Sequence, residues 1–204
     1  MARFDAVILA AGLSSRMGAR NKLLLKIRGT PMLVRVVRNY LDAIDGSVTL
    51  VTGQEAEAVE KAVAHLPIKI QRNLAFEKGQ QSSVVAGLSA PSGGAATLLG
   101  LGDQPMLSAD DLRWLMDAHA AAPSKITIPQ HEGQRGNPIV IPASMRPRML
   151  ADPKSAGCRA FTRENPDLVR FAASPSVGFV VDIDTPEEYS TYLAMKGDTY
   201  GIAL

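Results

Sequence analysis

Hydrophobic and polar positions change along the chain between two patterns, one typical of buried strands and one typical of amphipathic helices. Continuous apolar runs, such as residues 7–11 and 96–101, indicate strands buried on both faces. Between such runs, apolar residues recur at helical spacing. The pattern predicts strands at residues 7–11, 47–52, 68–71, 96–101, 126–129, 138–141 and 179–183. It predicts helices from Pro31 to about residue 41, at 55–65 and 82–89, from the N-cap Ser108 to about residue 121, and from Pro186 to about residue 196, with two short helices in 143–165 broken by Pro147 and Pro153.

This alternation predicts an α/β protein whose central sheet carries helices on both faces. No stretch of the 204 residues reads as a linker long enough to separate two domains. We therefore expect residues 1–204 to form a single domain.

Composition narrows the classes of function. A formal net charge of +2 argues against a broad nucleic-acid surface, and no apolar stretch approaches the roughly 20 residues of a membrane span. Cys158 is the single cysteine, which excludes an internal disulfide framework and a cysteine-clustered zinc site. We expect a soluble protein of the reducing cytoplasm, with neither nucleic acid nor a membrane as its partner.

The first strand leads into the most informative segment, V-I-L-A-A-G-L-S-S-R-M-G-A-R-N-K at residues 7–22. Small residues let a loop backbone approach an anion closely, and Arg16 and Lys22 supply fixed positive charge. The pattern favours a loop built around a nucleotide's phosphates. The alternative is an ordinary turn after a first strand. The segment matches neither the dinucleotide fingerprint nor the Walker loop.

Two acidic segments follow predicted strands. Asp103 comes directly after the strand at 96–101, where ligands collect in open α/β sheets. Asp182 and Asp184 would lie on the same side of the strand predicted at 179–183 and could face one cation. Carboxylates of this kind suit Mg²⁺. The alternatives are a turn before Pro105 for Asp103, and a helix start at 184–188 for the second segment.

The motif L-A-A-G-L-S-S-R-M-G-x-x-x-K resembles the signature of nucleotidyltransferases that activate a phosphorylated acceptor with an NTP. Within them it is most similar to the molybdenum cofactor cytidylyltransferases, relatives of the molybdenum cofactor guanylyltransferases. The resemblance implies a three-layer, Rossmann-like nucleotidyltransferase fold with a mostly parallel, mixed central sheet. It also implies an NTP-binding half at about 1–106 and an acceptor-binding half at about 107–204.

The same resemblance implies roles for individual residues. Arg16, Lys22 and Asp103 would be catalytic, and Asp103, Asp184 and Asp182 would hold Mg²⁺, with Mn²⁺ as the alternative metal. A serine N-cap is the alternative role for Ser83. The implied nucleotide-binding residues are Leu9, Ala10, Ala11, Gly12, Ser14, Ser15, Arg16, Lys22, Gly79, Ser83 and Gly102.

The acceptor side is less closely matched. Arg135, Gly136, Asn137 and Pro138 resemble the acceptor segment of the family, although a turn with a solvated arginine is the alternative for Arg135. The later Gly-Asp-x-Gly segment of the group reads K-S-A-G-C-R at residues 154–159 and lacks the acid. Gly157 and Arg159 remain candidate acceptor contacts.

The implied reaction is transfer of CMP from CTP to the phosphate of molybdenum-loaded molybdopterin, with release of pyrophosphate. The guanylyl version of the first motif has glycine at the position of Ala11, whose methyl group would narrow the pocket in favour of a pyrimidine. A molybdoenzyme would receive the product. The alternatives are transfer to another sugar or alcohol phosphate, a non-catalytic carrier of the cofactor, and a dinucleotide-binding oxidoreductase.

Overall fold

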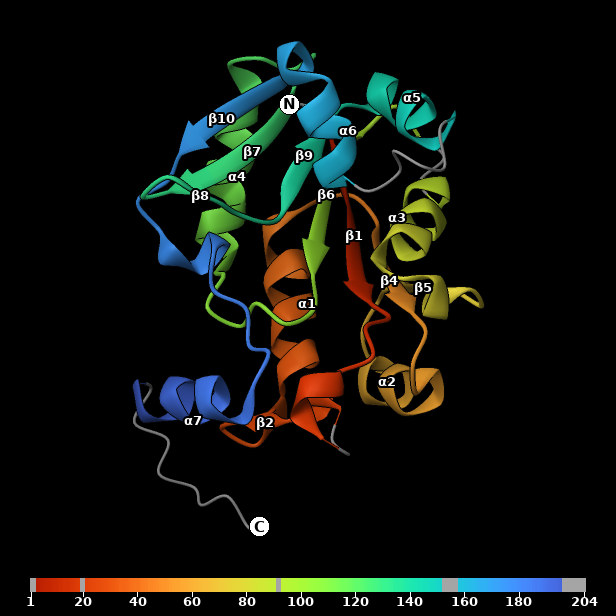
Figure 1. The fold of residues 1–204 in the computed structure, drawn as a ribbon, viewed down its shortest axis with the longest axis vertical. Coiled ribbons are helices and arrows are strands. Elements are labelled where there is room, and N and C mark those ends of the chain that lie inside the picture. Colours follow the sequence, from red (N-terminus) through yellow and green to blue (C-terminus); the bar gives the residue numbers. More distant parts are fainter. Residues whose placement is uncertain (1–2, 19–20, 91–92, 152–157, 196–204) are drawn as a thin grey trace.

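The central feature of the fold is one mixed β-sheet with helices on both sides (Figure 1). The computed structural model describes residues 3–18, 21–90, 93–151 and 158–195. Along the sheet the strand order is β10-β7-β9-β6-β1-β4-β5, and β8 pairs with β7. The pairs β1–β4, β1–β6, β4–β5 and β10–β7 are parallel, whereas β9 and β8 pair antiparallel with their neighbours. This is the mostly parallel α/β architecture that the sequence predicts.

The elements follow one another in an alternating order. The strands are β1 (Phe4–Ala10), β2 (Lys26–Ile27), β3 (Thr30–Pro31), β4 (Val48–Thr52), β5 (Lys69–Arg72), β6 (Ala96–Leu101), β7 (Ile126–His131), β8 (Gln134–Arg135), β9 (Ile139–Ile141) and β10 (Val169–Ala173). The α-helices are α1 (Met32–Ala43), α2 (Ala56–Val63), α3 (Gln80–Ser89), α4 (Ala109–Ala120), α5 (Arg146–Ala151), α6 (Cys158–Glu164) and α7 (Pro186–Met195). Short 3-10 turns lie at Ser15–Met17, Lys22–Leu24, Phe76–Lys78, Ala143–Met145, Pro166–Leu168 and Val177–Phe179.

The period-two pattern of β1 divides the core into two layers. Ala6 and Ile8 pack with α1, α2 and α4 on one face of the sheet, whereas Val7 and Leu9 pack with α3, α5 and α6 on the other. All seven residues of β1 are buried, as expected for a central parallel strand. Burial on both faces therefore explains why β1 reads as a continuous apolar run.

The strand order changes direction between β1 and β6, and this places the loops that matter for function. From β1 the chain continues outward to β4 and β5, and it then returns to pair β6 with the opposite side of β1. At such a switch point the loops that leave the carboxyl ends of neighbouring strands separate and open a crevice. The segment after β1 and the segment around Asp103 after β6 both start there.

One predicted strand is wrong. Residues 179–183 do not join the sheet: Val177–Phe179 is a 3-10 turn, and an irregular segment leads from it to α7. Its backbone contacts go to two different loops, because Asn137 N–H donates to the Phe179 carbonyl (2.8 Å) and Ile183 N–H donates to the Asp103 carbonyl (3.0 Å). The apolar side chains of Phe179 and Ile183 are buried in the core, although their backbone does not pair with a strand of the sheet.

Four of the described strands were not predicted from the sequence. Three of them, β2, β3 and β8, are two residues long, and the fourth is β10, at the edge of the sheet next to β7. Smaller differences concern the helices. Pro31 precedes α1 as its N-cap, and Pro147 lies in the first turn of α5 without breaking it. Pro153 lies outside the described residues. Among the described helices none is both long and apolar enough to cross a membrane.

Candidate active site

The loop after β1 contains two residues with a positive φ angle. Ser14 adopts a left-handed backbone with φ of 50°, and Gly18 has φ of 66°. A left-handed serine is uncommon, and such strain gathers at functional sites. The hydroxyl of Ser14 is buried without a hydrogen-bond partner in the described part of the chain. The loop therefore offers a polar group to a ligand.

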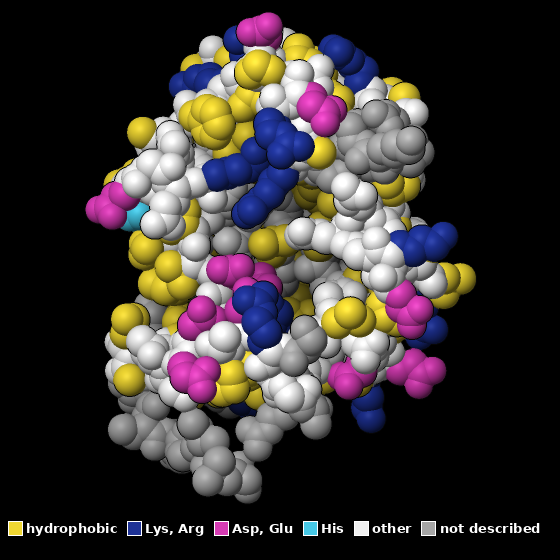
Figure 2. Space-filling view, in the orientation of Figure 1, with side chains coloured by type: hydrophobic (Ala, Val, Ile, Leu, Met, Phe, Trp, Pro, Cys, Tyr) yellow, Lys and Arg dark blue, Asp and Glu magenta, His cyan; other side chains and the backbone are white. Residues whose placement is uncertain are grey.

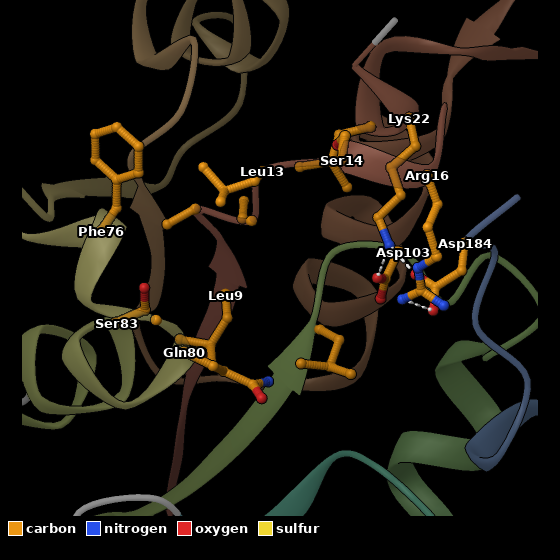
Figure 3. Close-up of a pocket in the computed structure, with 16 residues that line it drawn as sticks. Leu9, Leu13, Ser14, Arg16, Lys22, Phe76, Gln80, Ser83, Asp103 and Asp184 are labelled. Carbon is orange, nitrogen blue, oxygen red and sulfur yellow. Dashed lines mark hydrogen bonds and ion pairs between the residues drawn. The ribbon is translucent and has the colours of Figure 1, made fainter. Parts of the chain in front are cut away.

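A cluster of charged side chains lies at the carboxyl ends of β1 and β6 (Figure 3). Lys22 Nζ contacts Asp103 Oδ2 and lies 2.5 Å from Asp184 Oδ1. Arg16 Nη2 lies 2.6 Å from Asp184 Oδ2. The side chain of Lys22 is only 11% exposed, whereas that of Arg16 is 66% exposed. The cluster thus brings together Arg16 and Asp184, which are 168 positions apart in the chain.

Local structure explains how Lys22 is held. Asn21 caps the short 3-10 turn that begins at Lys22, because its side-chain oxygen accepts a hydrogen bond from Leu23 N–H (3.1 Å). The side chain of Leu23 is buried in the core formed with α1. These two anchors fix the backbone on either side of Lys22, so that its ammonium group faces the acids.

Asp182 and Asp184 reach the cluster without a strand. The hydrogen bond from Ile183 N–H to the Asp103 carbonyl lays their segment beside the end of β6. Directly afterwards Thr185 and Glu188 form the reciprocal capping box of α7: Glu188 N–H donates to Thr185 Oγ1, and Thr185 N–H donates to Glu188 Oε2. The predicted helix start and the predicted gathering of acids therefore occur together.

The charges of the cluster perturb one another. Burial would lower the pKa of Lys22, but its contacts with Asp103 and Asp184 raise that pKa above its ordinary value. Burial also raises the pKa of Asp103, and Lys22 only partly offsets this effect. The pKa of Asp184, which is less buried, falls below its usual value because Lys22 and Arg16 outweigh desolvation. Perturbed groups in a crevice are typical of functional sites.

The acids of the cluster fit a divalent cation. Asp103, Asp182 and Asp184 each offer a carboxylate oxygen, and these oxygens lie within 4.8 Å of one another. Asp103 Oδ1 is buried and has no hydrogen-bond partner among the described residues. An unpartnered buried carboxylate oxygen is costly unless a ligand meets it. Hard oxygen donors of this kind suit Mg²⁺ or Mn²⁺.

The smaller of two adjoining cavities, about 330 Å³, extends from this cluster to α3. Figure 3 shows the charged side chains at one end and Phe76 and Ser83 at the other. Ser83 is 5% exposed, and its hydroxyl accepts a hydrogen bond from Asn73 Nδ2 (3.0 Å). It is not the N-cap of α3, because that position belongs to Gly79, whose φ of 91° favours glycine. The predicted nucleotide residues that line the cavity are Leu9, Ala10, Ala11, Gly12, Ser14, Arg16, Lys22, Gly79 and Ser83.

The larger cavity, about 750 Å³, lies beside the first and has a basic wall. Arg135, Asn137 and Arg159 line it, as does Arg163 one turn after Arg159 on α6. Figure 2 shows Lys and Arg side chains gathered over α6 above a hollow, with acidic side chains below it. Arg135 Nη1 donates to Thr162 Oγ1 (2.6 Å), while burial and the charge of Arg159 lower the pKa of Arg135.

Several predicted site residues do not line either cavity. Gly102 packs between β1 and α1, where a β-carbon would lie 2.9 Å from Leu33. Gly136 and Pro138 are buried, and a β-carbon at Gly136 would lie 2.7 Å from the Phe179 carbonyl oxygen. These residues shape the wall from behind. Ser15 begins the 3-10 turn after Ser14, and Gly157 lies outside the described residues.

Other residues of the site were not singled out from the sequence. Phe76 and Gln80 line the smaller cavity, and Arg163 lines the larger. The helical spacing of Arg159 and Arg163 could have suggested a shared face of α6. No local signal marks Phe76, which reaches the cavity through the turn between β5 and α3. Burial raises the pKa of Cys158 to about 12, which disfavours the thiolate form.

Comparison with known proteins identifies the family. A family model described as the MobA-like NTP transferase domain matches residues 6–169. The chain belongs to this family. It is therefore a nucleotidyltransferase by family and an enzyme of the transferase class.

Two curated relatives differ in length and name. Nicotine blue oxidoreductase of Paenarthrobacter nicotinovorans is 32% identical over 189 residues, which cover 89% of this chain and 92% of that protein. The bifunctional protein GlmU of Acidiphilium cryptum is 33% identical over 150 residues. That match covers 71% of this chain but 33% of GlmU, so the chain spans about a third of the longer protein.

Solved structures share the fold over nearly the whole chain. A nucleotidyl transferase from Methanothermobacter thermautotroptrophicus has a TM-score of 0.81 at 23% identity, covering 97% of this chain and 99% of that one. Rv0371C of Mycobacterium tuberculosis, solved in complex with manganese, has a TM-score of 0.77 at 24% identity (94% and 98% covered). Molybdopterin-guanine dinucleotide biosynthesis protein A of Archaeoglobus fulgidus has a TM-score of 0.71 at 17% identity (96% and 100% covered).

Proposed function

We propose that this nucleotidyltransferase transfers CMP from CTP to the phosphate of molybdenum-loaded molybdopterin and releases pyrophosphate. Residues 1–204 act as a single domain, with an NTP-binding half at about 1–106 and an acceptor-binding half at about 107–204. The product passes to a molybdoenzyme. The MobA-like family and the Archaeoglobus fulgidus structure of the same fold support a molybdopterin-type acceptor.

One observation carries this proposal: the two cavities meet at the charged cluster. Both are lined by Leu9, Gln80, Leu101, Arg16, Asp103 and Asp184. A nucleotide in the smaller cavity and an acceptor in the larger would therefore bring two phosphates together between Arg16 and the carboxylates. Such an arrangement converts an encounter of two anions into a step within one complex.

The chemistry requires positioning and charge more than proton transfer. An oxygen of the acceptor phosphate attacks the α-phosphorus of CTP, the bond from that phosphorus to the β-phosphate oxygen breaks, and pyrophosphate leaves with the electron pair. The acceptor phosphate is already ionised at pH 7. Arg16 would hold the triphosphate and stabilise the leaving pyrophosphate, while Lys22 would reduce the repulsion between the α-phosphate and the acceptor phosphate.

Asp103 and Asp184, with Asp182, would hold Mg²⁺ or Mn²⁺. When bound, the ion would supply charge neutralisation at the α-phosphate. The manganese complex of Rv0371C supports a divalent metal on this fold. The residues themselves would orient the phosphates.

The preference for CTP rests on the end of the smaller cavity that lies near Phe76 and Ser83, away from the charged cluster. Ala11 is 5% exposed and lines this cavity together with Phe76 and Ser83. Its methyl group reduces the space available beside a base, which favours a pyrimidine over a purine. Ser83, already oriented by Asn73, would hydrogen-bond the base edge.

The test is pyrophosphate release with CTP, GTP, ATP or UTP in separate reactions containing Mg²⁺ and molybdenum-loaded molybdopterin. We expect release with CTP and little with the other three. Release with GTP above CTP would overturn the base assignment. If CTP releases pyrophosphate only when a sugar or alcohol phosphate replaces the pterin, that phosphate, and not molybdopterin, would be the acceptor. Binding of the pterin without any release would indicate a carrier.

The name of the Paenarthrobacter nicotinovorans relative favours a second candidate, an oxidoreductase. The loop after β1 lacks the dinucleotide glycine pattern, and hydride transfer would give the carboxylates of the cluster no role. Co-purification of NAD(P), or oxidation of NADH or NADPH by the protein, would support this candidate. Absence of both, together with pyrophosphate release, would exclude it.

A further inference from the structure

The position that a divalent cation would take in the charged cluster is filled by the protein's own cations. Lys22 Nζ bridges Asp103 Oδ2 and Asp184 Oδ1, two of the three carboxylates that offer a metal ligand atom. Arg16 holds the second oxygen of Asp184 at 2.6 Å. Three negative charges are therefore accompanied by two positive charges of the chain.

We propose that Lys22, assisted by Arg16, is the resident counter-ion of this site, so that a divalent metal enters only together with a nucleotide. This inference rests on the proposed function, whose metal and nucleotide sites it couples. The substrate of the enzyme would then be the metal–nucleotide complex, and the free metal ion would be a poor ligand. Lys22 and Arg16 thereby gain a positioning role before the reaction begins.

Burial explains why the carboxylates need a resident cation. Removing a carboxylate from water is costly unless an opposite charge compensates it. The side chains of Asp103 and Asp184 are 15% and 20% exposed, and Lys22 is the least exposed charged group beside them. A divalent ion arriving alone would have to displace a buried ammonium that has no other acid to contact among the described ion pairs.

A triphosphate supplies the missing destination. Lysine is a compact charge on a flexible stem with three donors, so Lys22 can turn from the carboxylates to phosphate oxygens. Arg16 already lines both cavities, and its largely exposed side chain is free to turn in the same way. Once both cations turn to the phosphates, all three carboxylates become available to the metal. Such coupling is reciprocal: the nucleotide tightens the metal by the factor by which the metal tightens the nucleotide.

The experiment measures Mn²⁺ binding by electron paramagnetic resonance, on the full chain, with and without a CTP analogue carrying a methylene group between the α- and β-phosphorus atoms. For the unchanged protein we expect weak Mn²⁺ binding alone and binding about 5- to 150-fold tighter with the analogue, the usual range of coupling between two sites. Lys22→Met should bind Mn²⁺ alone about 10-fold tighter than the unchanged protein, within that same range, and should lose most of the coupling.

Matched variants show whether the effect belongs to the site. Lys26→Met removes an exposed lysine of β2 and should behave as the unchanged protein. Lys22→Met combined with Asp103→Asn should lose the gained affinity. Thermal melting checks that each variant folds. If Lys22→Met does not fold, Arg16→Met replaces it, because the Arg16 side chain is 66% exposed; it should show a smaller gain in the same direction.

Two results would overturn the proposal: Mn²⁺ affinity of Lys22→Met equal to or weaker than that of the unchanged protein, or equal affinity of the unchanged protein with and without a bound analogue. Failure of the proposed function is distinguishable, because it would appear as a chain that binds no CTP analogue or releases no pyrophosphate. The comparison without nucleotide decides the role of Lys22 in either case.

Discussion

Replacing Ala11 by glycine should change the base preference of the enzyme more than its stability. Ala11 lies directly after β1, and its β-carbon would be 2.7 Å from a β-carbon placed on Gly53. Phe76 would lie 2.6 Å from the same point. The wall of the smaller cavity therefore contains Ala11 and Phe76 packed against the backbone of Gly53. This close packing is possible only because Gly53 has no side chain.

The size of the effect follows from the removal of one methyl group. One methylene in a substrate pocket is worth about 1–3 kcal/mol, or roughly 10- to 200-fold in discrimination. The wall can relax, so we expect Ala11→Gly to raise the ratio of kcat/KM for GTP to that for CTP by about 10-fold, the lower end of this range. The extra backbone freedom of glycine should cost about 0.5–1 kcal/mol. For a chain of this size, each kcal/mol of lost stability lowers Tm by roughly 2–4 °C.

Initial rates of pyrophosphate release with CTP and with GTP measure the ratio. Ala6→Gly is the matched control, because Ala6 belongs to β1, the strand that Ala11 follows, and packs in the core layer with α1, away from the cavity. It should lose comparable stability and keep the base preference. An unchanged ratio in Ala11→Gly, with both nucleotides still used, would refute the steric argument.

Four further predictions concern the acceptor, the core and the charged cluster. Arg163→Met should raise KM for the acceptor about 10-fold, as for one charged hydrogen bond, and leave KM for CTP unchanged in steady-state kinetics. Tyr40→Phe should stabilise the fold by up to about 1 kcal/mol in urea unfolding, since its hydroxyl is buried without a hydrogen-bond partner among the described residues. It should also reduce the cost of Gly100→Ala, whose β-carbon would lie 1.9 Å from that hydroxyl. Burial lowers the pKa of His119, so just below the ordinary histidine pKa the unfolded chain binds more protons than the folded chain. The free energy of unfolding should therefore fall as the pH drops through about 6.5. His119→Gln should make the melting temperature depend less on pH in this range. Asp103→Asn keeps the size of the side chain but removes its charge, so pyrophosphate release should fall roughly 100-fold or more.

The fold could be predicted where one local pattern decided the structure. Residues 96–101 form β6 with the predicted bounds, since six apolar or small residues in a row suit only a strand covered on both faces. Ser108 caps α4 through a reciprocal bond with Asp111, as the sequence indicates. These elements depend on their own residues and little else.

Prediction failed where distant parts of the chain decide. Residues 179–183 carry a strand-like pattern, but β7 and β9 already occupy the sheet next to β6, so the segment closes over the loop at Asp103 instead. The strand β10 has Phe171 exposed at the sheet edge, and its pattern of half-buried residues gives a weak signal. Only the tertiary arrangement distinguishes these two segments.

In the candidate site, too, some features follow from the local sequence and others depend on distant parts of the chain. Each motif could be read locally: a loop with Arg16 and Lys22, an acid after β6, and acids before α7. Which of them touch depends on the switch between β1 and β6 and on one backbone hydrogen bond, from Ile183 to Asp103. The pairing of Lys22 with two acids could not be foreseen from the sequence, because an ammonium and a metal ion compete for the same carboxylates and local sequence does not indicate which is present.

The path of the chain gives this competition a structural consequence. Lys22 and Arg16 belong to the loop after β1, and Asp184 belongs to the segment that leads to α7, so their ion pairs join parts of the chain more than 160 residues apart. A nucleotide that drew both cations to its phosphates would break these side-chain links, and the metal would have to restore the connection through Asp103 and Asp184. The two halves of the site would then be held together by the chain's own charges before binding and by the substrate complex afterwards. Because the metal and the nucleotide are both needed to replace these ion pairs, their binding should be coupled. This coupling does not depend on which phosphorylated acceptor binds afterwards.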